Sequence, residues 1–312
     1  MARVVVAGID GITGANLAAW LGEHHQVCGF SFSRPIAIEG CETRVCRTDD
    51  PDAIHSAVQD ARPEWLIYCG PAAESAWCGA AMPPEFQAIQ WARPWARAAA
   101  QLNCALTAIS SDAVFTGPWM FHQEDGNCHC ESPAARAVLA VEQEIAAAHQ
   151  NALIVRTNTF GWSPLRHSAG FVGNMLKAAE TQIPMELDCT RHATPILATD
   201  LAGVLNAAFE GGLRGLYHAG GAERVNPYRF GALVTDEFGC DFVANPISSL
   251  HADRRDTFGG GESSLQSRAI REALGIALPL LRDGLKRMHA QQDDGFSRRF
   301  VPEEITIHEM VA

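Results

Sequence analysis

The sequence predicts an α/β fold, a doubly wound parallel sheet joined to a second, smaller lobe. In its first half, apolar runs of strand length alternate with amphipathic runs of helix length, as in parallel sheets that carry helices on both faces. After Gly161 this alternation becomes irregular, and Gly, Trp and Pro cluster at residues 161–164. The chain has 312 residues, 47% of them hydrophobic, which is enough for a packed sheet domain and a lobe.

Each element of the first half is expected from its own pattern. Short apolar runs predict strands near residues 3–8, 26–31, 64–69, 104–110 and 152–156. Amphipathic runs, several opened by Pro in the first turn, predict helices near residues 12–21, 51–61, 84–102 and 133–149. We therefore assign residues 1–160 to the sheet domain, to which later segments can return, and residues 161–290 to the smaller lobe. The polar residues 291–312 are expected to form a peripheral tail.

Charge and composition argue against several classes of protein. The formal net charge of −12 and the scattered basic residues disfavour binding to nucleic acid or to a membrane surface. No stretch approaches about 18 consecutive apolar residues, and Met1-Ala2-Arg3 leads at once into a buried strand rather than a signal peptide. The ten cysteines lack paired zinc spacings and are expected to be reduced thiols. We therefore expect a cytoplasmic protein.

A glycine-rich turn lies between the first strand and the first helix. Residues 8–14 read Gly-Ile-Asp-Gly-Ile-Thr-Gly, and their context predicts a Rossmann dinucleotide-binding domain. Gly8 permits the tight turn, Gly11 lets a pyrophosphate approach the helix N-terminus, and Gly14 allows close packing of helix on strand. The residues assigned to this cofactor site are Gly8, Asp10, Gly11, Ile12, Gly14 and Gly70. The alternative is a glycine-rich turn without a ligand.

The end of the second strand favours NADP over NAD. Folds that prefer NAD usually place an acidic residue there, whereas this sequence has Ser31, Ser33 and Arg34. Hydroxyls and a guanidinium suit a 2′-phosphate, so these three residues are added to the cofactor site. Arg34 can equally be a solvated surface residue.

Five stretches in order carry a resemblance to a known family. They read Ser-Ser-Asp-Ala-Val-Phe-Thr-Gly at 110–117, Glu-Asp at 124–125, Arg-Thr-Asn and Phe-Gly-Trp at 156–162, Gly-Leu-Tyr-His-Ala-Gly-Gly at 215–221, and Ser-Ser-Leu-Gln-Ser at 263–267. On these motifs the chain resembles the dTDP-4-dehydrorhamnose reductase-like branch of the extended short-chain dehydrogenases/reductases. The resemblance implies that the smaller lobe is a substrate lobe, which grips a nucleotide sugar or a similar small polar carbonyl compound.

The same resemblance exposes a catalytic loss. In the family a Ser or Thr holds the substrate carbonyl, a Tyr donates the proton, and a Lys four residues later lowers the pKa of that Tyr. Ser111 matches the first role, but the Tyr position is Ala134 and the Lys position is Val138. The resemblance therefore implies that ordinary ketone reduction is lost.

The loss does not depend on the alignment. The only tyrosines are Tyr68, Tyr217 and Tyr228, and none of them has a Lys four residues later. Arg136 cannot substitute, because a guanidinium stays protonated and position 136 points roughly 200° away from position 134 on a helix.

The polar loop at residues 122–130 is the other unusual segment near the expected active site. His129 and Cys130, with Cys128, are candidates for a replacement acid or nucleophile, whereas adjacent Cys-His-Cys residues make a poor metal site, and no metal is expected. An ordinary surface loop is the simplest interpretation. Tyr217 and His218 are expected to pack in a strand of the substrate lobe.

Two functions remain open at this point. One is an atypical enzyme that keeps the nucleotide pocket and acts on a small-molecule substrate through other residues. The other is a non-catalytic protein that binds a dinucleotide or a sugar nucleotide and regulates or scaffolds a protein partner, or a second copy of itself in a homodimer.

Overall fold

The computed structural model describes residues 1–47, 50–78, 84–165, 169–248 and 257–301. Its centre is a seven-stranded sheet in the order β11-β7-β6-β5-β1-β2-β4, and every neighbouring pair in it is parallel. The strands are β1 (Arg3–Ala7), β2 (Gln26–Ser31), β4 (Glu42–Val45), β5 (Trp65–Tyr68), β6 (Ala105–Ser111), β7 (Leu153–Thr157) and β11 (Gly215–His218). The predicted doubly wound parallel sheet is confirmed.

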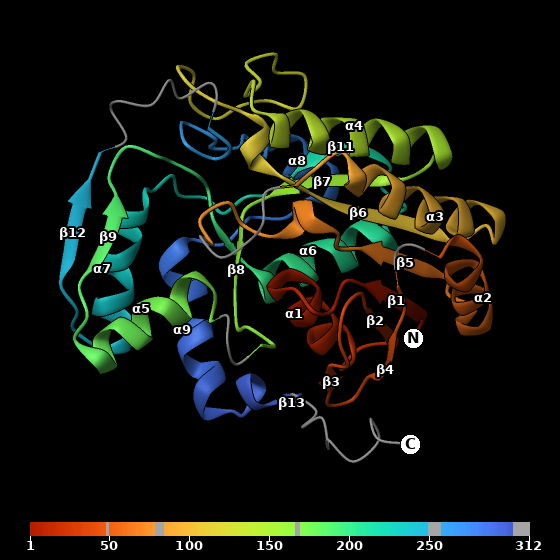
Figure 1. The fold of residues 1–312 in the computed structure, drawn as a ribbon, viewed down its shortest axis with the longest axis horizontal. Helices are drawn as coiled ribbons and strands as arrows, with labels where there is room; N and C mark the ends of the chain where they lie inside the picture. The colour runs from red at the N-terminus through yellow and green to blue at the C-terminus, as the bar shows by residue number, and fades with distance from the viewer. Residues whose placement is uncertain (48–49, 79–83, 166–168, 249–256, 302–312) are drawn as a thin grey trace, which may run out of the picture.

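Helices cover both faces of the sheet (Figure 1). One apolar layer contains α1 (Ile12–Leu21), α6 (Ala198–Glu210) and α8 (Arg268–Leu274). The other contains α2 (Pro51–Ala61), α3 (Gln87–Gln101) and α4 (Pro133–Ala148). The four helices predicted in the first half are all present, although α3 begins at Gln87 rather than near residue 84. In the described part of the chain, no helix has the length and apolar character needed to cross a membrane.

Local signals explain where the helices begin. In α2, the side chain of Asp50 accepts a hydrogen bond from the backbone N–H of Ala53 at 3.0 Å, and Pro51 occupies the first turn. In α4, Ser132 accepts from Ala135 N–H at 3.1 Å, again with a Pro in the first turn. Both ends combine an N-cap acceptor with a Pro that needs no hydrogen-bond partner, which stabilises a defined helix start.

Two strands of the sheet differ from the expectation. β4 was not predicted, because its residues are mostly exposed at the sheet edge and lack an apolar run. β11, which holds Tyr217 and His218, lies in the main sheet beside β7 and not in the substrate lobe. The chain returns to the sheet through α6, which packs against α1, so sequence order alone does not separate the two parts.

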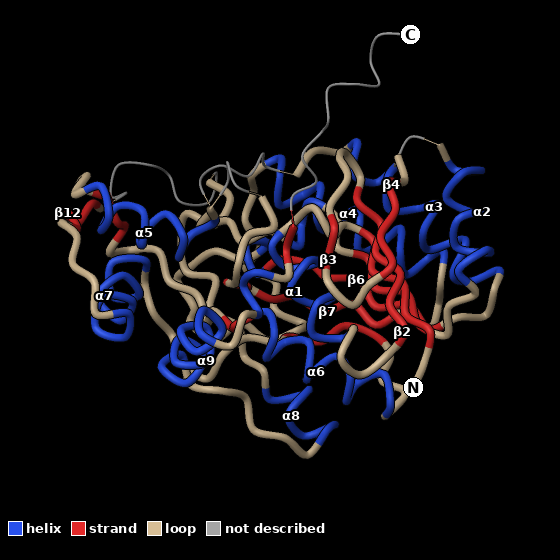
Figure 2. Tube along the Cα trace, turned by 90° about the horizontal axis from the view of Figure 1, so that it is seen from below, coloured by secondary structure: helices blue, strands red, loops and turns tan. Residues whose placement is uncertain are grey.

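The second lobe lies at the end of the molecule away from β2 and β4 (Figure 2). It contains α5 (Gly170–Thr181), α7 (Pro227–Phe238), α9 (Leu281–Asp293), and the parallel pair β9 (Met185–Asp188) and β12 (Ala244–Ile247). A separate apolar cluster that includes Met175, Phe230 and Leu285 forms its core. The short pair β8 (Thr159–Phe160) and β10 (Ile196–Leu197) lies where the chain passes between the lobe and the sheet.

The chain from Gln291, in the last turn of α9, to residue 301 is packed rather than peripheral. Gln291 accepts a hydrogen bond from Trp162 Nε1 at 3.1 Å and donates one to Thr199 Oγ1 at 3.0 Å. Further on, β13 (Phe300–Val301) pairs antiparallel with β3 (Ala37–Ile38). The predicted peripheral tail is therefore wrong for residues 291–301, because Phe296 and Phe300 belong to the apolar cluster that also contains residues of α1; residues 302–312 lie outside the described chain.

Candidate functional site

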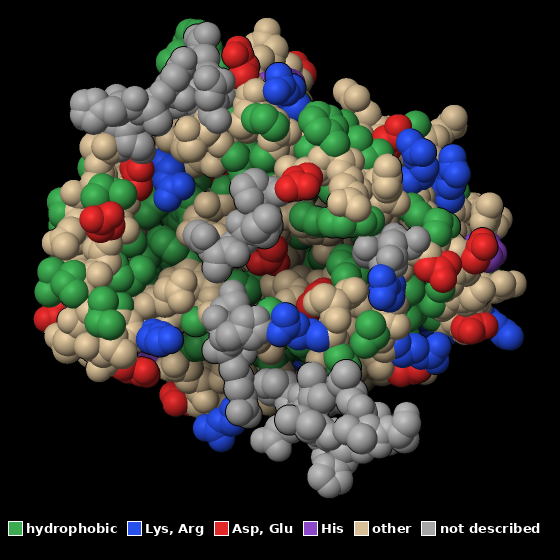
Figure 3. All heavy atoms as spheres, in the orientation of Figure 1, with side chains coloured by type: hydrophobic (Ala, Val, Ile, Leu, Met, Phe, Trp, Pro, Cys, Tyr) green, Lys and Arg blue, Asp and Glu red, His purple; other side chains and the backbone are tan. Residues whose placement is uncertain are grey.

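The candidate site lies where the sheet reverses its winding direction. β1 and β5 are neighbours, but the chain leaves β1 toward α1 on one side and leaves β5 toward the opposite layer. In open α/β sheets, ligands bind in the crevice that such a reversal creates at the carboxyl ends of the strands. The molecule is hollowed near the centre of the face in Figure 3, and Asp or Glu side chains lie in that hollow.

Gly8 and Gly14 are required by the backbone itself. Gly8 has a φ of +97°, and a Cβ there would collide with the carbonyl oxygen of Cys69. A Cβ at Gly14 would collide with the carbonyl oxygen of Gly8. A tight turn and a close approach of α1 to β1 are thus possible only with glycine at both positions.

Gly11 meets a side chain instead of backbone. A Cβ at Gly11 would collide with Oε1 of Glu74, which comes from the loop after β5. The Glu74 carboxyl group lies against the first turn of α1, where the backbone N–H groups of Thr13 and Ile12 lower its pKa. Burial nevertheless raises the pKa of Glu74 to about 7. The carboxyl group of Glu74 therefore lies at the helix N-terminus, at the place predicted for a pyrophosphate.

The residues predicted to bind the 2′-phosphate point in different directions. Ser31 is buried and its hydroxyl donates to the carbonyl oxygen of Arg44 at 3.5 Å. Ser33 is exposed and donates to Oδ2 of Asp10 at 2.8 Å, and Arg34 is also exposed. Ser33 and Arg34 are thus exposed to solvent, whereas Ser31 is not.

Gly70, the remaining residue assigned to the cofactor site, lies directly after β5. It is buried, and a Cβ there would press on the ring of Tyr68. It precedes the short helix η1 (Pro71–Ala73), whose first turn is closed by a hydrogen bond from Ala73 N–H to the Gly70 carbonyl at 2.9 Å. Gly70 therefore shapes the loop that carries Glu74.

Ser111 stands at the carboxyl end of β6, one strand beyond β5. Its Oγ accepts a hydrogen bond from Ala113 N–H at 3.1 Å, which leaves its own O–H available as a donor, but only 1% of the residue is exposed. The neighbouring Asp112 is also buried and accepts from Asn158 Nδ2 at 3.0 Å and from Ser263 Oγ at 2.8 Å. Burial raises the pKa of Asp112 to about 6, and these two hydrogen bonds oppose the rise.

The two residues that the sequence analysis assigns to the Tyr and Lys positions are packed side chains. Ala134 is 7% exposed and Val138 is fully buried, both on α4. Val138 belongs to an apolar cluster with Val114, Phe115 and Leu265. The space that a Lys ammonium would need is part of a hydrophobic core, which disfavours a charge.

The loop before α4 folds back on the same cluster. Thr116 N–H donates to the Cys128 carbonyl at 3.0 Å and Cys130 N–H to the Val114 carbonyl at 2.8 Å. The His129 ring stacks on Phe115 with ring centroids 5.4 Å apart, and burial lowers the pKa of His129. Cys130 is 2% exposed and donates to Ser132 Oγ at 3.3 Å.

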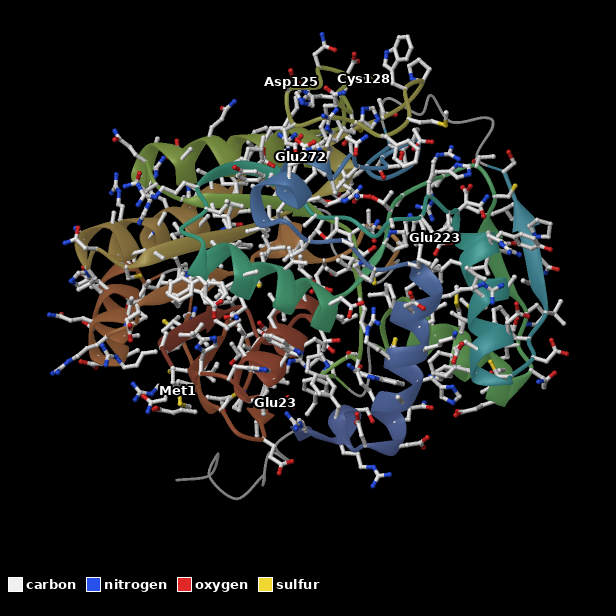
Figure 4. All side chains as sticks on the ribbon, turned by 180° about the vertical axis from the view of Figure 1, so that it is seen from behind. Met1, Glu23, Asp125, Cys128, Glu223 and Glu272 are labelled. Atoms are coloured by element: carbon white, nitrogen blue, oxygen red, sulfur yellow. The ribbon has the colours of Figure 1, made fainter. Side chains whose placement is uncertain are left out.

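The outer part of this loop projects from the molecule. Asp125 and Cys128 lie at its outer edge (Figure 4). Across the described residues, nowhere do three or more His, Cys, Asp or Glu side chains come together as metal ligands would.

Two features of the site were not predicted from the sequence. One is the contact of the Glu74 carboxyl group, from the loop after β5, with the first turn of α1. The other is the buried hydrogen-bond network around Asp112. The position of Glu74 in the sequence could have indicated this contact, since the loop after β5, the strand beside β1, faces the crevice. Asp112 was part of a quoted motif, but its burial depends on Ser263, which is far away in the sequence.

Known proteins resemble the chain over nearly its whole length. The model of the family described as RmlD substrate binding domain matches residues 2–293. No curated protein matches the sequence.

Solved structures share the fold at low sequence identity. The dTDP-4-dehydrorhamnose reductase of Bacillus anthracis str. Ames, in complex with NADP, has a TM-score of 0.77 and 20% identity, over 93% of this chain and 99% of that one. The enzyme WbmG of Bordetella bronchiseptica, in complex with NAD and UDP, has a TM-score of 0.74 and 14% identity, over 95% and 96%. MoeE5, in complex with UDP-glucuronic acid and NAD, has a TM-score of 0.71 and 17% identity, over 94% and 99%. At these identities the likeness establishes the fold.

Proposed function

Since the chain belongs to the RmlD substrate binding domain family, we propose that it binds NADP and a nucleotide sugar in one crevice and has lost ordinary Tyr/Lys ketone reduction. The observation that carries the proposal is the glycine turn of residues 8–14 at the switch point of the sheet, with the carboxyl group of Glu74 against the first turn of α1. A carboxylate there stands in for a phosphate, because both accept hydrogen bonds from a helix N-terminus.

The similar structures support the choice of ligands. They were solved with NADP, with NAD and UDP, and with NAD and UDP-glucuronic acid. A nicotinamide dinucleotide along the glycine turn and a nucleotide sugar toward the second lobe are therefore the ligands that this crevice is expected to take. Ser33 and Arg34, both exposed at the end of β2, favour NADP over NAD.

The residues at the catalytic end support binding more than reduction. A bound dinucleotide supplies a hydride, but the developing alkoxide also needs a proton. Ser111 can donate one hydrogen bond to a carbonyl oxygen, yet a Ser hydroxyl is too weak an acid to deliver the proton at neutral pH. Ala134 has no proton to give, and Val138 cannot anchor the nicotinamide ribose. Any reaction must use different groups of this chain.

A second candidate function is a non-catalytic binding protein. The complete burial of Val138 in the cluster with Phe115 and Leu265 favours it, because the Lys position has become core. The two candidates differ in turnover and not in ligand binding. A search for products from NADPH and a 4-keto nucleotide sugar separates them.

Thermal unfolding with equal concentrations of NADPH and NADH tests the proposal. We expect a modest stabilisation that is larger for NADPH, and we expect Gly11→Val to abolish it while the variant stays folded. The fold tolerates this change because the new side chain meets only the flexible end of Glu74. A larger shift with NADH would overturn the choice of NADP, and no shift with either cofactor would overturn dinucleotide binding.

A further inference from the structure

No side chain next to α1 in the sequence caps the first turn of this helix. Its N-cap residue is Gly11, which offers no side-chain acceptor. The first amides of a helix have no partner inside the helix and need one from elsewhere. Here Glu74, from the loop on the other side of the switch point, supplies it to Ile12 and Thr13.

The backbone that carries Glu74 is anchored on both sides. The Thr13 hydroxyl donates to the Ala73 carbonyl oxygen at 2.7 Å. The Ser75 hydroxyl donates to Oδ1 of Asn158 at 2.8 Å and accepts from Trp77 N–H at 3.2 Å. Glu74 itself is only half-buried. Its side chain can therefore rotate toward solvent while the loop stays in place.

A carboxylate and a pyrophosphate cannot share these amides. Both are anions that need the same N–H groups, and like charges at hydrogen-bond separation repel strongly in a partly buried site. Asp10 adds a second negative charge beside Glu74. The space in front of Gly11 that a Cβ would fill is taken by Oε1 of Glu74.

We infer that Glu74 competes for the phosphate site: its carboxylate holds the position of the pyrophosphate and must leave the first turn of α1 before a dinucleotide can bind. This inference rests on the proposed function, since it assumes that the crevice takes a dinucleotide. It makes Glu74 a competitor built into the chain, which lowers the affinity for the cofactor without changing the shape of the glycine turn.

The charge state of Glu74 gives the competition a pH dependence. The ionisable groups that act on it are Asp10, which is acidic, and the thiols of Cys69 and Cys78. Burial raises the pKa of both thiols, so they are neutral near pH 7. Below about pH 7 Glu74 is protonated and releases the amides more readily. As the pH rises through about 7, the carboxylate forms and the affinity for a dinucleotide falls.

Isothermal titration calorimetry of the full chain with NADPH, which measures the affinity for the cofactor, tests this inference. The proteins compared are the wild type, Glu74→Ala, Glu74→Gln and Glu85→Gln, at pH 6 and pH 8. Glu85 is an exposed acid away from α1, so Glu85→Gln removes a carboxyl group of the same kind without changing the phosphate site. The comparison between variants at one pH removes the titration of the 2′-phosphate of the ligand.

At pH 8 we expect Glu74→Ala to bind NADPH about 10-fold more tightly than the wild type, Glu74→Gln to lie between them, and Glu85→Gln to match the wild type. On going from pH 8 to pH 6, the wild type should gain several-fold more affinity than Glu74→Gln. Equal affinities for the wild type and both Glu74 variants, or weaker binding by Glu74→Ala, would overturn this inference and leave the proposed function standing. No binding by any of the proteins would overturn the proposed function, and this inference with it.

Discussion

The two ends of the crevice have diverged in opposite ways. At the phosphate end, Gly8 and Gly14 have a backbone geometry that requires glycine, and the carboxyl group of Glu74 lies against the first turn of α1. At the catalytic end, Ser111 remains at the end of β6, but Ala134 and Val138 have become packed side chains on α4. The proposed binding geometry depends on backbone, whereas the proton donor that we propose to be absent depends on two side chains.

This difference between the two ends explains why the chain has the fold of a reductase family and yet lacks the Tyr and Lys expected for ketone reduction. The family match and the parallel sheet depend on the backbone architecture that both ends share. General acid catalysis depends on one hydroxyl and its neighbouring ammonium, which point mutations remove without disturbing the sheet. Each prediction below changes one end and measures whether the other follows.

The largest effect is expected from restoring the catalytic pair. Ala134→Tyr together with Val138→Lys should raise NADPH oxidation with a 4-keto nucleotide sugar by about 10²–10⁴-fold, the usual contribution of a general acid. Either substitution alone should achieve much less, because Tyr without the ammonium keeps a pKa near about 10. Steady-state assays, with circular dichroism to show that each variant is folded, check this. A wild type already as active as the double variant would show that another acid operates.

Gly14→Val should destabilise the fold at the phosphate end of the crevice. The new Cβ would meet only backbone atoms of Gly8 and Ile9, which cannot move aside. We expect a loss of about 4 kcal/mol or more in the free energy of unfolding, measured by denaturant titration. Gly11→Val is the matched control and should lose less than about 1 kcal/mol, because it displaces only the Glu74 side chain. Equal losses for the two variants would contradict the different roles assigned to these glycines.

Val138→Lys alone should destabilise the catalytic end. A buried ammonium among Val114, Phe115 and Leu265 has no partner in that cluster, so we expect a cost of about 3 kcal/mol at pH 7. Burial lowers the pKa of a Lys, so the unfolded chain binds more protons, and the stability of this variant should rise with pH. Val138→Met is the neutral control. A variant as stable as the wild type would mean that the ammonium reaches solvent or a charge.

The sequence allowed more of the fold than of the site to be predicted. The glycine turn, the starts of α2 and α4, and the absence of a Tyr-Lys pair follow from local residues, and the structure agrees with the first two in detail. The Glu74 contact follows from the meeting of two loops that lie far apart in the sequence. Edge strand β4 and the packed segment that ends at β13 also depend on distant partners, which local patterns do not reveal.

The smallest effect is expected from the loop before α4. His129 stacks on Phe115, and Cys130 is buried against Ser132. Neither is placed as the acid of the crevice, so His129→Asn should change any NADPH oxidation, in the wild type or in the restored double variant, by less than about twofold. A replacement acid would instead lose about 10²-fold or more. Loss of that size in the wild type would move the catalytic acid into the loop.

A crystal structure of the wild-type protein with NADPH bound tests the central claim most directly. The account predicts the pyrophosphate on the amides of Ile12 and Thr13, the Glu74 carboxylate rotated away from Gly11, and the nicotinamide facing Ser111 with no proton donor at position 134. A crystal grown at saturating NADPH in which Glu74 still holds the amides, and no dinucleotide lies along the glycine turn, would contradict it.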